Sequence, residues 1–178
     1  MIDLLRKRRS IRAYTDQPVD RQKIDLIVEA LLRAPSSRNI SPWQFIVVDD
    51  RELLIKLSAA KQHGSSFLKG AAVGIVVCAD STKSDVWIED CSIASILAQL
   101  TAQSVGLGSC WIQIRNRQHD KAITSEQYIQ DLLGIPEHIR VESIISIGNP
   151  AETREPLSAS KLEYEKVRHN RHSSTWSR

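Results

Sequence analysis

The chain has 178 residues, with 24 Lys or Arg against 21 Asp or Glu, and a formal net charge of +3 at pH 7. This length suits one globular domain, and so small a surplus of charge excludes a general polyanion binder. Its three cysteines are odd in number and lie in apolar segments, which argues against a disulfide framework and favours reduced thiols in a cytoplasmic protein. The longest apolar run, residues 71–79, is too short to cross a bilayer of about 30 Å, and no signal peptide is recognisable.

The predicted elements alternate between helix and strand. Near the N-terminus a first helix is expected to give way to an extended stretch at residues 13–19. Asp20 then caps an amphipathic helix that ends before Pro35. The segment 86–105 is apolar on more than one helical face, so we expect it to lie centrally and against another subunit. Further helices are predicted at 52–60 and 124–134, and strands at 44–48, 73–79, 109–114 and 141–147.

From Gly148 onward the chain is polar and charged. Leu162, Tyr164, Val167 and Trp176 are isolated apolar residues that cannot form a core of their own. Two alternatives follow: this tail stays disordered, or it packs on another surface.

A cluster of cations near the N-terminus is the first candidate site. Arg8, Arg9 and Arg12 with Ser10 would supply the charged and hydroxyl donors that bind a phosphate. By itself such a cluster is more often a solvated basic surface. A nucleic-acid patch is a weaker alternative, because no aromatic residues interleave with the arginines.

Two further clusters are ordinary when taken alone. Pro35 is followed by the hydrogen-bonding residues Ser36, Ser37 and Asn39, which are common in turns. The turn at residues 106–108, Gly-Leu-Gly, follows a helix and precedes a strand, the reverse of a dinucleotide fingerprint. It is either a helix C-cap or a place where the backbone approaches a planar ring. The five histidines lack ligand spacing, so no metal site is predicted.

Taken together and in this order, the clusters resemble the nitroreductase family of FMN-dependent oxidoreductases. The resemblance extends from Arg8 to about Arg171 through the segments RRSIR, APSSRNISPWQF, FLKGAAVGIVVCAD, VGLGSCWI, IGNPAETREP and YEKVRHNRH. It implies one α+β domain over residues 1–178, an α/β/α sandwich with a mixed central sheet. It also implies an intertwined homodimer in which the tail, about residues 150–178, wraps over the partner.

The resemblance assigns cofactor contacts to several residues of this chain. Arg8 and Ser10 would hold the FMN phosphate, with Arg154 nearby, and Arg12 would reach the pyrimidine edge of the flavin. Arg9 is a further expected cofactor-binding residue. A loop from the partner subunit would contact the cofactor through Pro35, Ser36, Ser37 and Asn39. The flavin ring and its N5 would lie beside Trp111, Ile112 and Gln113.

Two departures from the family pattern concern the flavin ring. Gln113 and Ile114 replace two glycines that many short members have, which changes how closely the backbone approaches the ring. Gly64 and Phe67 fall where some members place polar residues near the flavin, and Phe67 is expected to shape a substrate pocket instead.

The implied activity transfers hydride from NADH or NADPH through flavin N5 to a nitroaromatic, quinone or similar small electrophile, in two half-reactions. The flavin carries this chemistry, so no catalytic side chain is predicted. Neither nucleic acid nor a membrane is an expected partner. Three alternatives remain: another flavin reaction such as dehalogenation or flavin breakdown, a flavin storage or sensor protein, and a nucleic-acid-associated domain.

Overall fold

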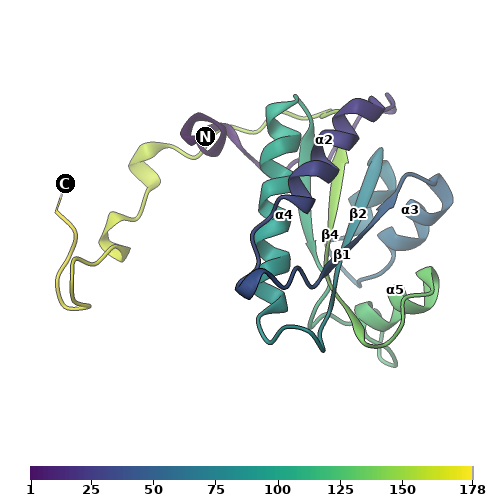
Figure 1. The fold of residues 1–178 in the computed structure, drawn as a ribbon. Helices are drawn as coiled ribbons and strands as arrows, with labels where there is room; N and C mark the ends of the chain where they lie inside the picture. Colours follow the sequence, from purple (N-terminus) through teal and green to yellow (C-terminus); the bar gives the residue numbers. More distant parts are fainter. Residues whose placement is uncertain (178) are drawn as a thin grey trace.

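A computed structural model of the chain describes residues 1–177, and one four-stranded sheet lies at its centre (Figure 1). In the order β1-β2-β4-β3, the strands are β1 (Trp43–Val48), β2 (Val73–Asp80), β4 (Ile139–Gly148) and β3 (Gly108–Gln113). All three neighbouring pairs are antiparallel. Among the described residues, the parallel component of the predicted mixed sheet is one bridge between Ser10 and Ser109, at the β3 edge.

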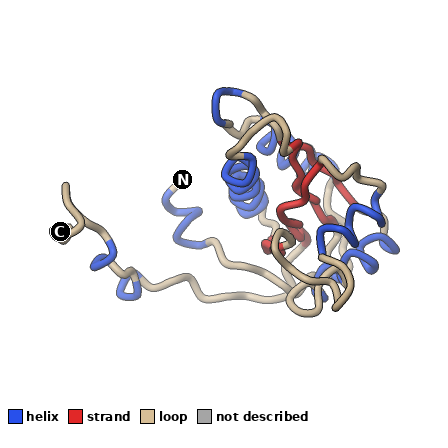
Figure 2. Tube along the Cα trace, turned by 90° about the horizontal axis from the view of Figure 1, so that it is seen from below, coloured by secondary structure: helices blue, strands red, loops and turns tan. Residues whose placement is uncertain are grey.

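Helices cover both faces of the sheet (Figures 1 and 2). On one face lie α2 (Arg21–Leu32) and α4 (Trp87–Ser104), and on the other α3 (Arg51–Ser58) and α5 (Ser125–Leu133). Two separate apolar clusters fill the spaces between these layers, one on each side of the sheet. Strand residues alternate between the clusters, as Ile144 and Ile145 illustrate. The predicted α/β/α sandwich is confirmed.

Local signals account for several helix ends. The Asp20 side chain accepts a hydrogen bond from the backbone N–H of Gln22 and caps α2. Thr124 caps α5 in the same way through Gln127 N–H. Gly134 ends that helix with a left-handed φ of 66°, the conformation that glycine adopts without strain.

Helix α4 has one buried and one uncovered side. Ala94, Ala98 and Ala102 are fully buried against the sheet and α2. Ile93 and Ile96, on the outward side, are 39% and 37% exposed. The apolar character on more than one face, noted in the sequence, therefore leaves large aliphatic side chains bare in a single chain.

The C-terminal tail first pairs with the N-terminal segment and then leaves the body. Asn149 and Ala151 exchange backbone hydrogen bonds with Thr15 and Ala13. Beyond Glu155 the chain projects from the α4 side of the body, through short 3₁₀ turns and a small hairpin (Figures 1 and 2). Its large apolar side chains stay exposed in the single chain: Leu157, Leu162, Val167 and Trp176. Arg178, the last residue of the predicted tail, lies outside the described residues.

Candidate functional site

The segment after α1 (Ile2–Lys7) lies flat on the end of the sheet because two glycines make room for it. Gly108 of β3 and Gly148 of β4 are paired in the register. A Cβ at Gly108 would lie 2.8 Å from Cγ2 of Ile11, and one at Gly148 would lie 2.8 Å from Cδ1 of Tyr14. The space at Gly108 is thus filled by Ile11. This corrects the idea that this turn opens the backbone to a planar ring.

Gly106, the other glycine of that turn, ends a helix. Gly106 follows α4 with a φ of 80°, and no atom lies within 4 Å of the Cβ it lacks. It follows the C-cap Val105 as the left-handed residue that ends the helix.

Five of the predicted cofactor-binding residues meet in one groove. The groove has a volume of about 410 Å³ and is lined by Arg8, Arg9, Ser10, Arg12 and Arg154, together with Leu5 and Leu157. Residues from the two ends of the chain therefore form its two walls. One direct link joins them: Arg9 Nη1 donates a hydrogen bond of 2.7 Å to the carbonyl oxygen of Glu155.

Glu152 organises this groove, and the sequence reasoning missed it. Its Oε1 accepts from the backbone N–H of Arg12 at 2.6 Å, and its Oε2 accepts from Arg154 Nε at 2.8 Å. The Arg12 amide, above all, lowers the pKa of the Glu152 carboxyl. Glu152 is therefore a carboxylate that fixes the Arg12 backbone and neutralises Arg154. Its place two residues before Arg154 was the available signal.

Two arginines of the groove, Arg8 and Arg12, differ from Arg154 in their hydrogen bonds and ion pairs. Within residues 1–177, the side chains of Arg8 and Arg12 make no hydrogen bond or ion pair, whereas Arg154 is paired with Glu152. Arg12 instead lies over the ring of Phe67, with 5.7 Å between its guanidinium carbon and the ring centroid. Unpaired guanidinium donors beside a hydroxyl suit a phosphate ester, which accepts several charge-assisted hydrogen bonds. The donor set therefore fits the phosphate of a nucleotide cofactor.

The three β3 residues differ in what they present. Ile112 is fully buried in the cluster against α3 and α5, so its side chain cannot contact a ligand, and only its backbone is available. Trp111 and Gln113 point to the other face and are half-buried. Trp111 Nε1 donates to Gln113 Oε1 at 3.0 Å, and Gln113 Nε2 donates to the carbonyl oxygen of Arg115 at 3.1 Å. The Gln113 amide is thereby held in one orientation.

The predicted serine loop lies far from the groove. The backbone N–H of Ser37 donates to Asp90 at 2.8 Å, in the first turn of α4. Arg9 and Arg154 lie near the other end of α4, where they share a second groove with Gln103. The 18 residues of α4 span about 27 Å at 1.5 Å per residue. One chain therefore does not bring Pro35, Ser36, Ser37 and Asn39 to the arginines.

Comparison with known proteins identifies the family. The model of the nitroreductase family matches residues 5–62 and 54–149. The chain belongs to the nitroreductase family. The resemblance noted in the sequence is thereby confirmed.

Relatives of the chain match most of its length. An FMN-dependent nitroreductase from Clostridium difficile R20291 shares 50% identity and a TM-score of 0.95, covering 96% of this chain and 99% of its own. A protein of Archaeoglobus fulgidus, provisionally named an NADH dehydrogenase/NAD(P)H nitroreductase, is 39% identical over 86% of this chain and 87% of its own. An NAD(P)H-dependent FMN reductase of Bacillus subtilis is 30% identical, over 95% of this chain and 72% of its own.

Residues 1–177 contain neither a candidate membrane span nor a cluster of metal ligands. No helix there is both long and apolar enough to cross a membrane. Nor do three or more His, Cys, Asp or Glu side chains gather there as metal ligands would.

Proposed function

We propose that this nitroreductase-family chain is an FMN-dependent NAD(P)H oxidoreductase, which works as a homodimer in two half-reactions and reduces small electrophiles such as nitroaromatics or quinones. The observation that carries the proposal is the groove in which, among residues 1–177, the Arg8 and Arg12 guanidinium groups make no hydrogen bond or ion pair. The names of the relatives support it, since one is an FMN-dependent nitroreductase and another an FMN reductase.

Each part of the site has a task in binding and orienting the cofactor. Arg8, Arg9 and Ser10 would hold the phosphate, and Arg12, anchored by Glu152, would point toward the ring. The β3 segment would lie along the ring, with Gln113 held by its own hydrogen bonds. When bound, FMN supplies the transfer of hydride from the nicotinamide to the acceptor.

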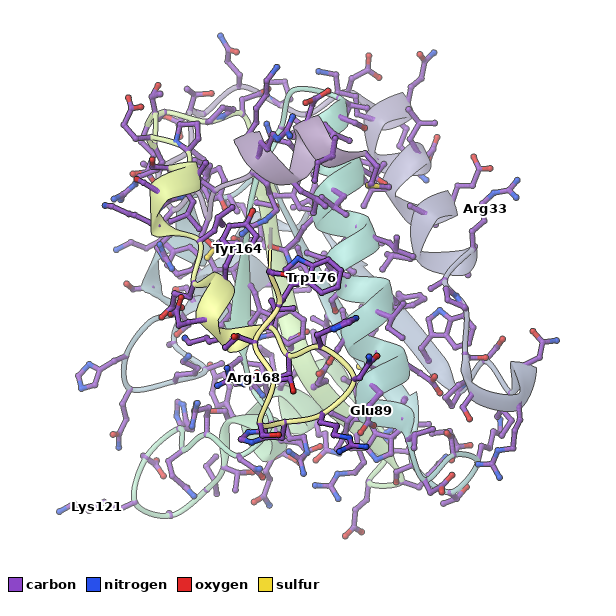
Figure 3. The ribbon with its side chains drawn as sticks, turned by 90° about the vertical axis from the view of Figure 1, so that its left-hand side faces the viewer. Arg33, Glu89, Lys121, Tyr164, Arg168 and Trp176 are labelled. Atoms are coloured by element: carbon purple, nitrogen blue, oxygen red, sulfur yellow. The ribbon has the colours of Figure 1, made fainter. Side chains whose placement is uncertain are left out.

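The homodimer is supported by the two parts of the site, which one chain keeps apart. If a two-fold axis passed through the uncovered side of α4, the α4 helices of the two subunits would pack in opposite directions. The serine loop of each subunit would then face the arginine groove of its partner. Ile93 and Ile96 would then be covered. The tail projects from this same side: in Figure 3 the segment with Tyr164 and Trp176 stands before α4, and Figure 1 shows it displaced outward. It would wrap over the partner.

The cysteines bear on the compartment. Cys78, Cys91 and Cys110 are all buried and free. Since free thiols are typical of reducing compartments, we place the enzyme in the cytoplasm.

An anaerobic visible spectrum tests the function directly. The protein is reconstituted with FMN, freed of unbound flavin, and titrated with NADH or NADPH. We expect one flavin per chain, bleached by at least one nucleotide and restored by a quinone. Bound flavin that neither nucleotide bleaches would point to a storage or sensor protein, and absence of bound flavin would overturn the proposal.

A mixed dimer tests the shared site. One subunit carries Arg8→Ala in the groove, and the other carries Asn39→Ala in the loop. If each site combines one groove and one loop, the mixed dimer regains one intact site of two, and each parent homodimer has none. A mixed dimer whose two sites keep the FMN affinities of the two parent homodimers, with no site of wild-type affinity, would refute the sharing.

A further inference from the structure

Strand β4 contains an irregularity that turns one acidic residue inward. The register with β2 shifts between Val77, which pairs with Ser143, and Cys78, which pairs with Val141. Glu142 is the extra residue of this bulge. As a result both Glu142 and Ser143 reach the same helix: Glu142 contacts Ser92, and Ser143 contacts Ser95 of α4.

The Ser92 hydroxyl lies within hydrogen-bond distance of two oxygen atoms, and its one proton cannot serve both. If Glu142 were ionised, one of these two contacts would have no proton. Ser92 Oγ lies 2.8 Å from the carbonyl oxygen of Ile88 and 2.6 Å from Glu142 Oε1. A hydroxyl has a single proton, and a carbonyl oxygen can only accept. When Ser92 donates to Ile88, as helical serines commonly do, the proton in the shorter contact must come from Glu142.

Burial of the second oxygen leads to the same conclusion. Glu142 is only 2% exposed, and its Oε2 has no hydrogen-bond partner among the described residues. A charged oxygen left bare in the interior is costly, whereas the carbonyl oxygen of a neutral acid is much less so.

The surrounding charges do not outweigh this burial. From α4, Glu89 faces Glu142 and opposes its ionisation, and the Cys91 thiol is also near. Arg115, just beyond β3, favours ionisation, and Cys78 of β2 belongs to the opposite face of the sheet. A hydrogen bond from Ser92 to the carboxylate would also favour ionisation, but burial is the largest influence and raises the pKa of Glu142 from 4.5 to about 7.

Glu142 also supports the end of β3 through its backbone. Its carbonyl oxygen accepts hydrogen bonds from the N–H groups of Ile114 and Arg115, at 3.0 and 2.9 Å. These residues directly follow Gln113. One residue thus connects α4, through its side chain, to the strand end that would lie beside the flavin.

We propose that Glu142 is a neutral carboxylic acid that donates its proton to Ser92, and that this hydrogen bond positions the Gln113 end of β3 against α4. The second half rests on the proposed function, because only there does Gln113 adjoin a cofactor. Glu142 is a positioning residue, since it touches no reacting atom. Above the pKa of about 7, Ser92 would donate its hydrogen bond to the Glu142 carboxylate instead of to the Ile88 carbonyl. The second carboxylate oxygen, Oε2, would then be a buried anionic atom without a partner among the described residues.

The protonation state is tested first, on protein without flavin. Infrared difference spectra between about pH 6 and about pH 8, on either side of that pKa, should show a protonated-carboxyl C=O band that disappears at the higher pH. The band should be missing in Glu142→Gln, whose amide can still donate to Ser92. If wild type and Glu142→Gln have the same spectra, the neutral acid is refuted, whether or not the protein binds FMN.

FMN affinity then tests the positioning role. In the wild type the Kd should rise several-fold from about pH 6 to about pH 8, whereas Glu142→Gln should keep the low-pH value throughout. Ser95→Ala, which alters the neighbouring serine contact, is the matched control and should follow the wild-type profile. A Glu142→Gln profile that matches the wild type would overturn the positioning role. Failure of every variant to bind FMN would instead refute the proposed function and with it that role.

Discussion

Replacing Gly108 with alanine is a stringent test of how the arginine groove is built. The added Cβ would lie 2.8 Å from Cγ2 and 2.9 Å from Cβ of Ile11. Because the Ile11 Cβ is attached to the backbone and Ile11 is buried, rotation of a flexible side-chain end cannot relieve the overlap. The segment that carries Arg8, Ser10 and Arg12 must move instead.

The cost has two components. Overpacking of this kind destabilises a fold by about 1–3 kcal/mol, and each kcal/mol lowers Tm by about 2–4 °C in a domain of this size. Displacing even one charged hydrogen bond to the phosphate would cost about 1.5–3 kcal/mol, a rise in FMN Kd of about tenfold or more. Urea unfolding and a fluorescence titration with FMN measure the two effects separately.

Two controls make the result decisive. Gly70→Ala places a Cβ where no atom lies within 4 Å, and it should leave the FMN Kd unchanged. Ile11→Ala in the Gly108→Ala background removes two of the three crowded atoms, so the double variant should lose less stability than the sum of the single variants. Additive losses, or a Gly108→Ala protein as stable and as tight for FMN as the wild type, would refute the packing argument.

Three other substitutions test neighbouring features. Arg8→Ala should raise the FMN Kd by about tenfold or more, with part of the affinity regained in Arg8→Lys, and equal affinities would remove Arg8 from the phosphate site. Tyr14→Phe deletes the hydroxyl that donates to the Ile11 carbonyl at 2.6 Å, and it should lower the unfolding free energy by about 1 kcal/mol. An unchanged midpoint of urea unfolding would rule out this loss. Glu126→Gln removes the charge of a buried carboxylate that accepts hydrogen bonds from Arg140 Nε at 2.7 Å and from Val141 N–H at 2.8 Å. The variant should lose about 1–3 kcal/mol of unfolding free energy and keep the wild-type FMN Kd, and a changed FMN Kd would contradict a purely structural role.

Ionisation of Glu142 also predicts how stability depends on pH. Because folding raises the pKa of this group, its contribution is complete below the ordinary value of 4.5 and is lost as the pH rises through about 7. The difference corresponds to about 3 kcal/mol. Relative to the wild type, Glu142→Gln should therefore gain stability as the pH rises from about 5 to about 7. A constant difference between the two proteins in urea titrations would contradict this.

Local sequence signals predicted the elements well. Asp20, Thr124 and Gly134 are cap residues whose effect depends on one turn of backbone, and the helices they bound match the structure. Periodicity located all four strands, but their ends shifted by up to two residues. The β4 strand, for example, begins at Ile139, where pairing with Asp80 extends it. Such pairing is not visible in a local window.

Site features that depend on distant neighbours were not predictable. Ile112 matched a motif that lies beside a cofactor, but the twofold alternation along β3 buries its side chain. Nothing near Gly108 in the sequence indicates that Ile11 fills its space. The bulge at Glu142 likewise arises from a mismatch between two strands.

The sequence alone determined the family, the helix and strand positions and the residues that carry charge, because these depend on residue type and short-range spacing. Tertiary structure decided which charges remain free: Glu152 neutralises Arg154, whereas Arg8 has no ion pair with any other described residue. It also placed the serine loop and the arginines near opposite ends of α4, a helix about 27 Å long. Both outcomes depend on contacts between residues far apart in the chain, which only the folded arrangement specifies.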